Sequence, residues 1–326
     1  MKNIETGCQK RRRILIIPPA GLGDMIMAAP VIRALRQKFP DAWLAVLADY
    51  MRGAGEIGRC MSYLDEVIDF RLRRYSWGCV IKFFLSSYWP MLIDLRRKKF
   101  DTAVILGRNP IRTILVRMMT VKNILCVKGR GHPTRLGLDL VSKLGCSNEP
   151  LDFGFSCPDV RLEDILPKNT PRPWIGIHPF SAMNWREWSN FRDLAQKLKN
   201  RNGTVILLGK KAEHKQVEGL CDMVNKLSVK QLIAVIKNLD VLVSCDSGPM
   251  HIGFAVGTPT VAIFGPIAPQ YRMPLTKSSR HQIVYDSDTY KDRYIQMKER
   301  YPEEVNLFEN ISADKVYEAV VRILAP

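Results

Sequence analysis

The sequence predicts an α/β protein built from two domains, each with a parallel sheet covered by helices on both faces. Short apolar segments of strand length alternate with segments of helical periodicity, as is typical of parallel sheets. The alternation stops at residues 166–173 (LPKNTPRP), where three prolines occur in eight residues, and then starts again. A chain of 326 residues suits two domains of ordinary size. We expect an N-terminal domain at 1–166 and a C-terminal domain at 174–311.

The first half opens with a strand, a glycine-rich turn and a helix. In the helix, Ala28, Ile32 and Leu35 fall on one face. Pro30 kinks the first turns of this helix or marks where its regular part begins. The expected elements are strands at 13–17, 43–47 and 101–106 and a helix at about 25–38.

The second half repeats this alternation after the proline-rich segment. Ser228 and Gln231 form an S-x-x-Q capping box before an apolar run, which predicts a helix start. The expected elements are strands at 174–178, 204–208, 240–244 and 260–264, helices at 190–199, 212–225 and about 312–324, and a short helix at 246–251. In open parallel sheets, ligands bind outside the carboxyl ends of the strands, so two facing sheets place a site between the domains.

The charge balance bears on binding partners rather than on the fold. Lysine and arginine number 49 against 32 aspartates and glutamates, which gives a net charge of +17. Nucleic acid, an anionic membrane surface and a phosphorylated substrate are the candidate partners, and solvated surface charge accounts for most of these residues. No basic run is long enough to suggest a nucleic-acid-binding tail, so we expect no nucleic-acid partner.

Two further features bear on the cellular compartment. The eight cysteines contain no CxxC pair and no Cys/His spacing of a zinc site, so we expect reduced thiols in a cytoplasmic protein. The apolar stretch at 77–95 contains Lys82, Pro90 and Asp94, which argue against a transmembrane helix. We favour an ordinary core helix there over a helix at a membrane surface.

The first candidate site is the turn Gly21-x-Gly23-Asp24 between a strand and a helix. The glycines allow a tight turn, and the helix N-terminus supplies free N–H groups. The turn lacks the third glycine of a dinucleotide-binding fingerprint. Asp24 is either a helix-capping residue or a carboxylate at a cleft that serves as a general base.

The second candidate site is the segment Asp246-Ser247-Gly248, which follows a strand and opens a helix. Backbone N–H groups of Ser247 and Gly248 would be offered to a phosphate at this helix N-terminus. His251 follows on the first turn and faces the same side. The alternative is a capped helix with a core histidine.

Two weaker signals follow other strands of the second half. Ser181 and Arg186 follow the strand WIGIH, and a hydroxyl and a guanidinium there could hold a diphosphate. Glu213 follows Gly209 at the end of the next strand, where a carboxylate could bind ribose hydroxyls.

Together these segments resemble glycosyltransferase family 9, the heptosyltransferase family. The resemblance rests on GLGDMIMAAPVIRALRQKFP in the first half, and on WIGIHPFSAMNWREWSNFRDLAQKL and VLVSCDSGPMHIGFAVGTPTVAIFGPIAP in the second. It covers both halves, from about residue 13 to residue 269.

The resemblance implies a fold, a reaction and a location. The fold would be of the GT-B type, two Rossmann-like domains facing across a cleft, with the final helix at about 312–324 packed back on the first domain. The reaction would be inverting sugar transfer without a metal or other cofactor, from an ADP-sugar, usually ADP-heptose. The acceptor would be a phosphorylated lipopolysaccharide core sugar at the inner face of the cytoplasmic membrane.

The resemblance also implies residue roles. Asp24 would be the base that deprotonates the acceptor hydroxyl, with Gly21 and Gly23 in the loop near the acceptor. The first domain would bind the acceptor and the second the donor. The implied donor contacts are Ser181 and Arg186 to the diphosphate, Glu213 to the ribose, and Asp246, Ser247, Gly248 and His251 to the phosphate and the sugar.

Other functions remain open from the residues alone. A glycosyltransferase of the same fold could use another nucleotide-sugar. The incomplete glycine fingerprint counts against an NAD-dependent oxidoreductase. A basic module that binds nucleic acid or an anionic membrane would fit the charge, but no nucleic-acid motif accompanies it. A protein that retains the fold without activity is disfavoured, since the site residues are present.

Overall fold

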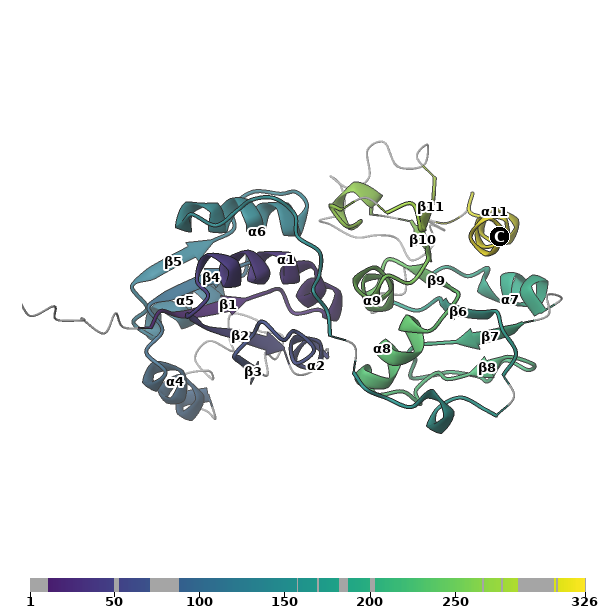
Figure 1. Cartoon of the computed structure of the whole chain (residues 1–326), viewed down its shortest axis with the longest axis horizontal. Coiled ribbons are helices and arrows are strands. Elements are labelled where there is room, and N and C mark those ends of the chain that lie inside the picture. Colours follow the sequence, from purple (N-terminus) through teal and green to yellow (C-terminus); the bar gives the residue numbers. More distant parts are fainter. Residues whose placement is uncertain are drawn as a thin grey trace, which may run out of the picture.

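The computed structural model describes residues 11–49, 53–70, 88–156, 158–168, 170–181, 187–199, 203–265, 267–276, 278–286, 308 and 310–325. They form two α/β lobes side by side, joined by an extended connection (Figure 1). The predicted fold class is confirmed, because each lobe contains an all-parallel sheet with helices on both faces.

The first sheet has the strand order β3-β2-β1-β4-β5. Its strands are β1 (Arg13–Ile17), β2 (Trp43–Asp49), β3 (Glu66–Phe70), β4 (Thr102–Ile105) and β5 (Asn123–Cys126). Its helices are α1 (Leu22–Lys38), α2 (Ala54–Gly58), α4 (Tyr88–Arg97), α5 (Pro110–Met118) and α6 (Pro133–Val141).

The side chains of β1 show how this sheet is covered. Successive residues of a strand point to opposite faces. Ile14 and Ile16 pack in the core shared with α1, α2 and α6, whereas Leu15 and Ile17 pack in the core shared with α4 and α5. A strand that is apolar at nearly every position is therefore buried on both sides, as the sequence pattern indicated.

The second sheet has the order β11-β10-β9-β6-β7-β8, which repeats the topology of the first with one more strand. Its strands are β6 (Trp174–His178), β7 (Thr204–Leu207), β8 (Cys221–Asp222), β9 (Val241–Cys245), β10 (Thr260–Phe264) and β11 (His281–Tyr285). Its helices are α7 (Phe191–Lys199), α8 (Val229–Lys237), α9 (Gly248–Val256) and α11 (Ala313–Leu324).

The final helix packs on the second domain and not, as the resemblance implied, on the first. Helix α11 packs on the second sheet beside α7, with Val316, Ala319 and Val320 buried in the core of that domain, and not on the first domain (Figure 1). The cause is local: Ile311, just before the helix, accepts hydrogen bonds from Trp188 Nε1 (2.9 Å) and Asn190 (3.1 Å), which hold the helix start against the second domain.

The prediction of a helix at 212–225 is also wrong. The chain there forms turns and the short strand β8, which pairs with β7. Asp222 organises this segment: its carboxylate accepts from the backbone N–H of Val224 (3.0 Å) and Val217 (3.3 Å) and lies 2.6 Å from Nε2 of His214. Sheet pairing and these side-chain bonds outweigh the helical propensity of the segment.

Part of the apolar stretch 77–95 lies outside the described residues. Its last residues, from 88 onward, belong to α4, in which Leu92 and Leu95 are buried in the first domain. Among the residues that the structure describes, no helix is both long enough and apolar enough to span a membrane.

Candidate active site

The two sheets bring their switch points to the boundary between the domains. In each sheet the strand order reverses beside the first strand, between β1 and β4 and between β6 and β9. Ligands of such sheets bind outside the carboxyl ends of the strands at this point. Helices α1 and α9 begin at the carboxyl ends of β1 and β9 and pack against each other. The candidate site is therefore the region where these two helices start.

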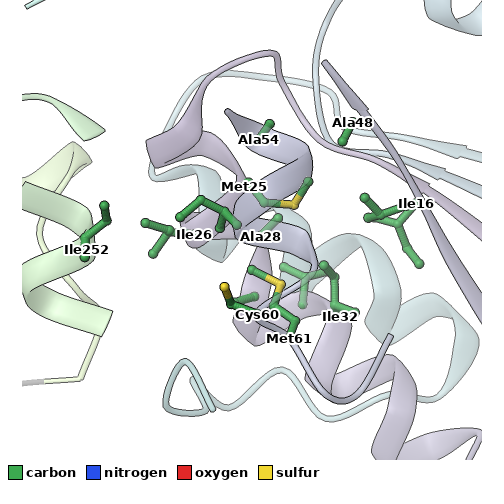
Figure 2. Close-up of a cluster of buried hydrophobic side chains, with 14 of the residues drawn as sticks. Ile16, Met25, Ile26, Ala28, Ile32, Ala48, Ala54, Cys60, Met61 and Ile252 are labelled. Carbon is green, nitrogen blue, oxygen red and sulfur yellow. The ribbon is translucent and has the colours of Figure 1, made fainter. Parts of the chain in front are cut away.

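The domains share a hydrophobic core next to this region. Ile26 on α1 faces Ile252 on α9 across the boundary, and both side chains are buried in the same cluster (Figure 2). The N-termini of the two helices are thus held in a defined relation by apolar packing.

Asp24 makes a capping contact at the start of α1, and its carboxylate lies near the domain boundary. Helix α1 begins at Leu22, earlier than expected, and Asp24 is its third residue. Its Oδ2 accepts a hydrogen bond of 2.9 Å from the backbone N–H of Gly21, as a capping residue does. A Cβ at Gly21 would lie 2.7 Å from this oxygen, so a larger residue there would displace the carboxylate. The carboxylate is only partly buried.

His251 of the second domain packs directly on the first. A Cβ at Gly23 would lie 2.5 Å from Cδ2 of His251, which leaves room only for glycine. Burial, and after it the nearby Arg272, lower the pKa of His251 to about 3, while the carboxylate of Asp24 acts in the opposite direction. The imidazole is therefore neutral at physiological pH, and Asp24 and His251 lie near each other across the boundary.

Asp246 lies between His251 and a cation that the sequence did not single out. Its Oδ1 is 4.0 Å from Nε2 of His251, and its Oδ2 is 3.8 Å from Nε of Arg272. The side chain of Arg272 is 21% exposed. Its position after β10 gave no recognisable spacing in the sequence, because the contact depends on the fold of the following loop.

A pocket between the domains adjoins these groups. It is lined by both domains, including Pro30, His132, His251 and Arg272. Nε2 of His132 lies 2.8 Å from the carbonyl oxygen of Met273, and its Nδ1 accepts from an N–H at the start of α6. An imidazole with these two partners is neutral and protonated on Nε2, and burial lowers its pKa.

Ser247 is held inward by a buried histidine. Its hydroxyl lies 3.0 Å from Nδ1 of His178 and 3.1 Å from the carbonyl oxygen of Cys245. Burial lowers the pKa of His178 to about 4. Because the hydroxyl is engaged there and makes no cap bond, the start of α9 at Gly248 presents backbone N–H groups and no side-chain cap.

The remaining predicted donor residues follow β6 and β7. The N–H of Ser181 donates to Oε1 of Glu187 (3.2 Å), and both carboxylate oxygens of Glu187 accept from Nζ of Lys211 at 2.8 Å. Glu213 is exposed in the loop after β7, at the same carboxyl edge of the sheet. Arg186 lies outside the described residues.

The structure therefore brings Asp24, Asp246, Gly248 and His251 together and leaves Glu213 at the periphery. The described part of the chain contains no group of three or more His, Cys, Asp or Glu side chains arranged to hold a metal ion.

Comparison with known proteins shows similarity to one family. The family "Glycosyltransferase family 9 (heptosyltransferase)" matches residues 146–301, which include the Asp246 to His251 segment. Lipooligosaccharide heptosyltransferase 2 of Haemophilus ducreyi is 23% identical, with 96% of this chain and 99% of that protein covered.

Solved structures show the same fold. A glycosyltransferase of family 9 from Veillonella parvula has a TM-score of 0.74 at 19% identity and covers 96% of this chain and 97% of its own. ADP-heptose lipopolysaccharide heptosyltransferase II of E. coli has a TM-score of 0.71 at 18% identity, with 96% and 98% covered. Residues 146–301 match glycosyltransferase family 9, the relatives that match over most of the chain are heptosyltransferases, and the chain is a glycosyltransferase.

Proposed function

We propose that this enzyme transfers a heptose from ADP-heptose to a sugar of a lipopolysaccharide core or a related glycan, with inversion at the anomeric carbon and without a metal ion. The heptosyltransferases among its relatives support the sugar and the acceptor class. An E. coli heptosyltransferase of the same fold, solved with ADP-2-deoxy-2-fluoro heptose, supports the donor.

The observation that carries the proposal is the contact between the two switch points. His251 packs on Gly23, next to Asp24, so a carboxylate of the first domain adjoins the helix start of the second. A donor phosphate at the start of α9 and an acceptor hydroxyl at Asp24 would then lie on opposite sides of one reacting carbon.

The first domain binds the acceptor in this proposal, and Asp24 acts as the general base. The acceptor oxygen attacks the anomeric carbon from the face opposite the diphosphate, and Asp24 takes the hydroxyl proton as the bond forms. Attack from that face inverts the configuration. The hydrogen bond from Gly21 fixes the carboxylate without consuming its second oxygen.

The second domain binds the donor. Negative charge grows on the leaving diphosphate, and preorganised positive groups can stabilise it in place of a metal. Arg272 beside Asp246 and the N-terminus of α9 supply such groups among the described residues. Arg186 and Ser181 complete the proposed diphosphate contacts, and Glu213 binds the ribose.

The acceptor class agrees with the charge of the chain. A net charge of +17 favours a phosphorylated glycolipid and peripheral contact with the inner face of an anionic membrane. The enzyme would then act in the cytoplasm at that surface.

Calorimetric titration with ADP, UDP, GDP and NAD in the presence of EDTA tests the donor assignment. We expect selective binding of ADP that Arg272→Gln weakens, because it removes a positive group beside the diphosphate, and that Asp24→Asn leaves unchanged, because Asp24 lies on the acceptor side. Selective binding of UDP or GDP would overturn the ADP-heptose donor, and a strict need for divalent metal would overturn metal independence.

A further inference from the structure

A buried arginine lies at the carboxyl edge of the first sheet, beside the loop that leads to Asp24. Arg112 is the third residue of α5 and is 6% exposed. Its Nη1 donates to the carbonyl oxygen of Pro18, the first residue after β1. A Cβ at Gly107 would lie 2.9 Å from Nη1, so the chain after β4 leaves space for this guanidinium.

The stability of α5 does not explain why a cation occupies this position. Leu115 and Val116 already anchor the helix in the apolar core. Burying a guanidinium costs free energy, and an apolar side chain of similar size would cost less. Burial lowers the pKa of Arg112, which reflects the free-energy cost of keeping the charged guanidinium at this position.

Among the described residues, no direct ion pair neutralises the charge of Arg112, and its buried Nε has no hydrogen-bond partner. Asp24 and Asp49 act on it at longer range, in the direction that favours the charged form. The cation therefore lies within the electrostatic reach of the carboxylate at the candidate active site.

We propose that Arg112 is a positioning residue for Asp24. The guanidinium holds the Pro18 carbonyl and so fixes the turn from Pro18 to Gly21. The N–H at the end of this turn binds Oδ2 of Asp24 at 2.9 Å. This inference rests on the proposed role of Asp24 as the base, and adds that the geometry of the base is set from α5.

The test compares Arg112→Met and Arg112→Lys with Arg117→Met, since Arg117 lies on the same helix and is exposed. The assay is transfer from ADP-heptose to a panel of truncated lipopolysaccharide cores. We expect kcat of Arg112→Met to fall about 100-fold, because small misplacements of a catalytic group have effects of this order. The Kd for ADP should stay within twofold, Arg112→Lys should recover part of kcat, and Arg117→Met should match the unmodified enzyme.

A readout that needs no substrate accompanies the kinetics. The N–H of Gly21 should exchange with deuterium faster in Arg112→Met than in Arg117→Met, because its bond to Asp24 is no longer held. If Arg112→Met does not fold, Gly107→Ala keeps the arginine and displaces its guanidinium from Pro18. We expect kcat to fall in Gly107→Ala as well, but less than in Arg112→Met.

A double-mutant comparison separates this inference from the proposed function. If Arg112 acts through Asp24, Arg112→Met should slow Asp24→Asn little further. Fully additive effects of the two substitutions would overturn the inference and leave the proposed function intact. Normal turnover and normal exchange in Arg112→Met, with Asp24→Asn inactive, would do the same. Normal turnover in Asp24→Asn would overturn the base role itself, and this inference with it.

Discussion

The substitution Gly23→Ala tests the contact between the two domains. A Cβ at this position would lie 2.5 Å from Cδ2, 3.3 Å from Cγ and 3.2 Å from Nε2 of His251. The imidazole cannot simply swing away, because its side chain is 5% exposed and packs edge-on against Phe254 at 6.1 Å. The clash must be relieved by separating the N-termini of α1 and α9.

The magnitude follows from the cost of overpacking. Forcing one extra carbon into a packed site costs about 1–3 kcal/mol. Alanine gains up to about 1 kcal/mol over glycine in a helix, which offsets part of this cost without removing the clash. If the strain acts on the domain contact, the population with the helix starts together falls by roughly 5- to 150-fold. We expect kcat/KM to fall within that range.

The assay pairs sugar-transfer kinetics with small-angle X-ray scattering. Gly137→Ala is the matched control, because its Cβ would lie 2.6 Å from Cγ2 of Val31, entirely within the first domain. We expect both variants to lose stability, but only Gly23→Ala to increase the separation of the domains. Unchanged scattering and unchanged kcat/KM in Gly23→Ala would show that this contact does not hold the site together.

Two further predictions concern stability. Burial lowers the pKa of His178 to about 4 and that of His251 to about 3, whereas an unfolded histidine has a pKa of about 6.5, so unfolding takes up protons at acid pH. The free energy of unfolding should therefore fall as the pH drops below 6.5, by up to about 3 kcal/mol per pH unit near pH 5 for two protons. Equal urea midpoints at pH 7 and pH 5 would contradict this. Ser228→Ala should lower the free energy of unfolding by about 1 kcal/mol, because it removes the 3.3 Å bond to the N–H of Gln231 at the start of α8. Thermal unfolding measures this loss, and Ser189→Ala, at an exposed serine, is the control.

Much of the fold was predictable because its strands are short apolar runs between strong boundary signals. Strands β1, β6 and β10 have the predicted bounds. Prolines or glycines close to their ends define them. The S-x-x-Q box also forms as predicted, with reciprocal bonds between Ser228 and Gln231.

Where prediction was wrong, contacts distant in sequence decided the structure. The segment at 212–225 has helical composition, but pairing with β7 makes part of it a strand. The final helix has an apolar face that would suit either domain, and the hydrogen bonds from Trp188 and Asn190 to Ile311 select the second. Local sequence does not contain this information.

The candidate site also contains residues that local sequence predicts and residues that only tertiary contacts place there. Asp24, Asp246 and His251 were predicted because each lies at a strand-to-helix turn, where parallel sheets place their ligands. Arg272 and Arg112 were missed because their relevance depends on tertiary contacts: one reaches Asp246 from the loop after β10, and the other reaches the β1 loop from α5.

In the proposed reaction, Asp24 of one domain and the helix start of the other act on one reacting carbon. The most direct measurement is transfer from ADP-heptose to truncated lipopolysaccharide cores in EDTA, with the product's anomeric configuration read by NMR. We expect an inverted product from the unmodified enzyme and, from Asp24→Asn, loss of turnover with ADP affinity unchanged. A retained configuration, or full turnover in Asp24→Asn, would contradict it.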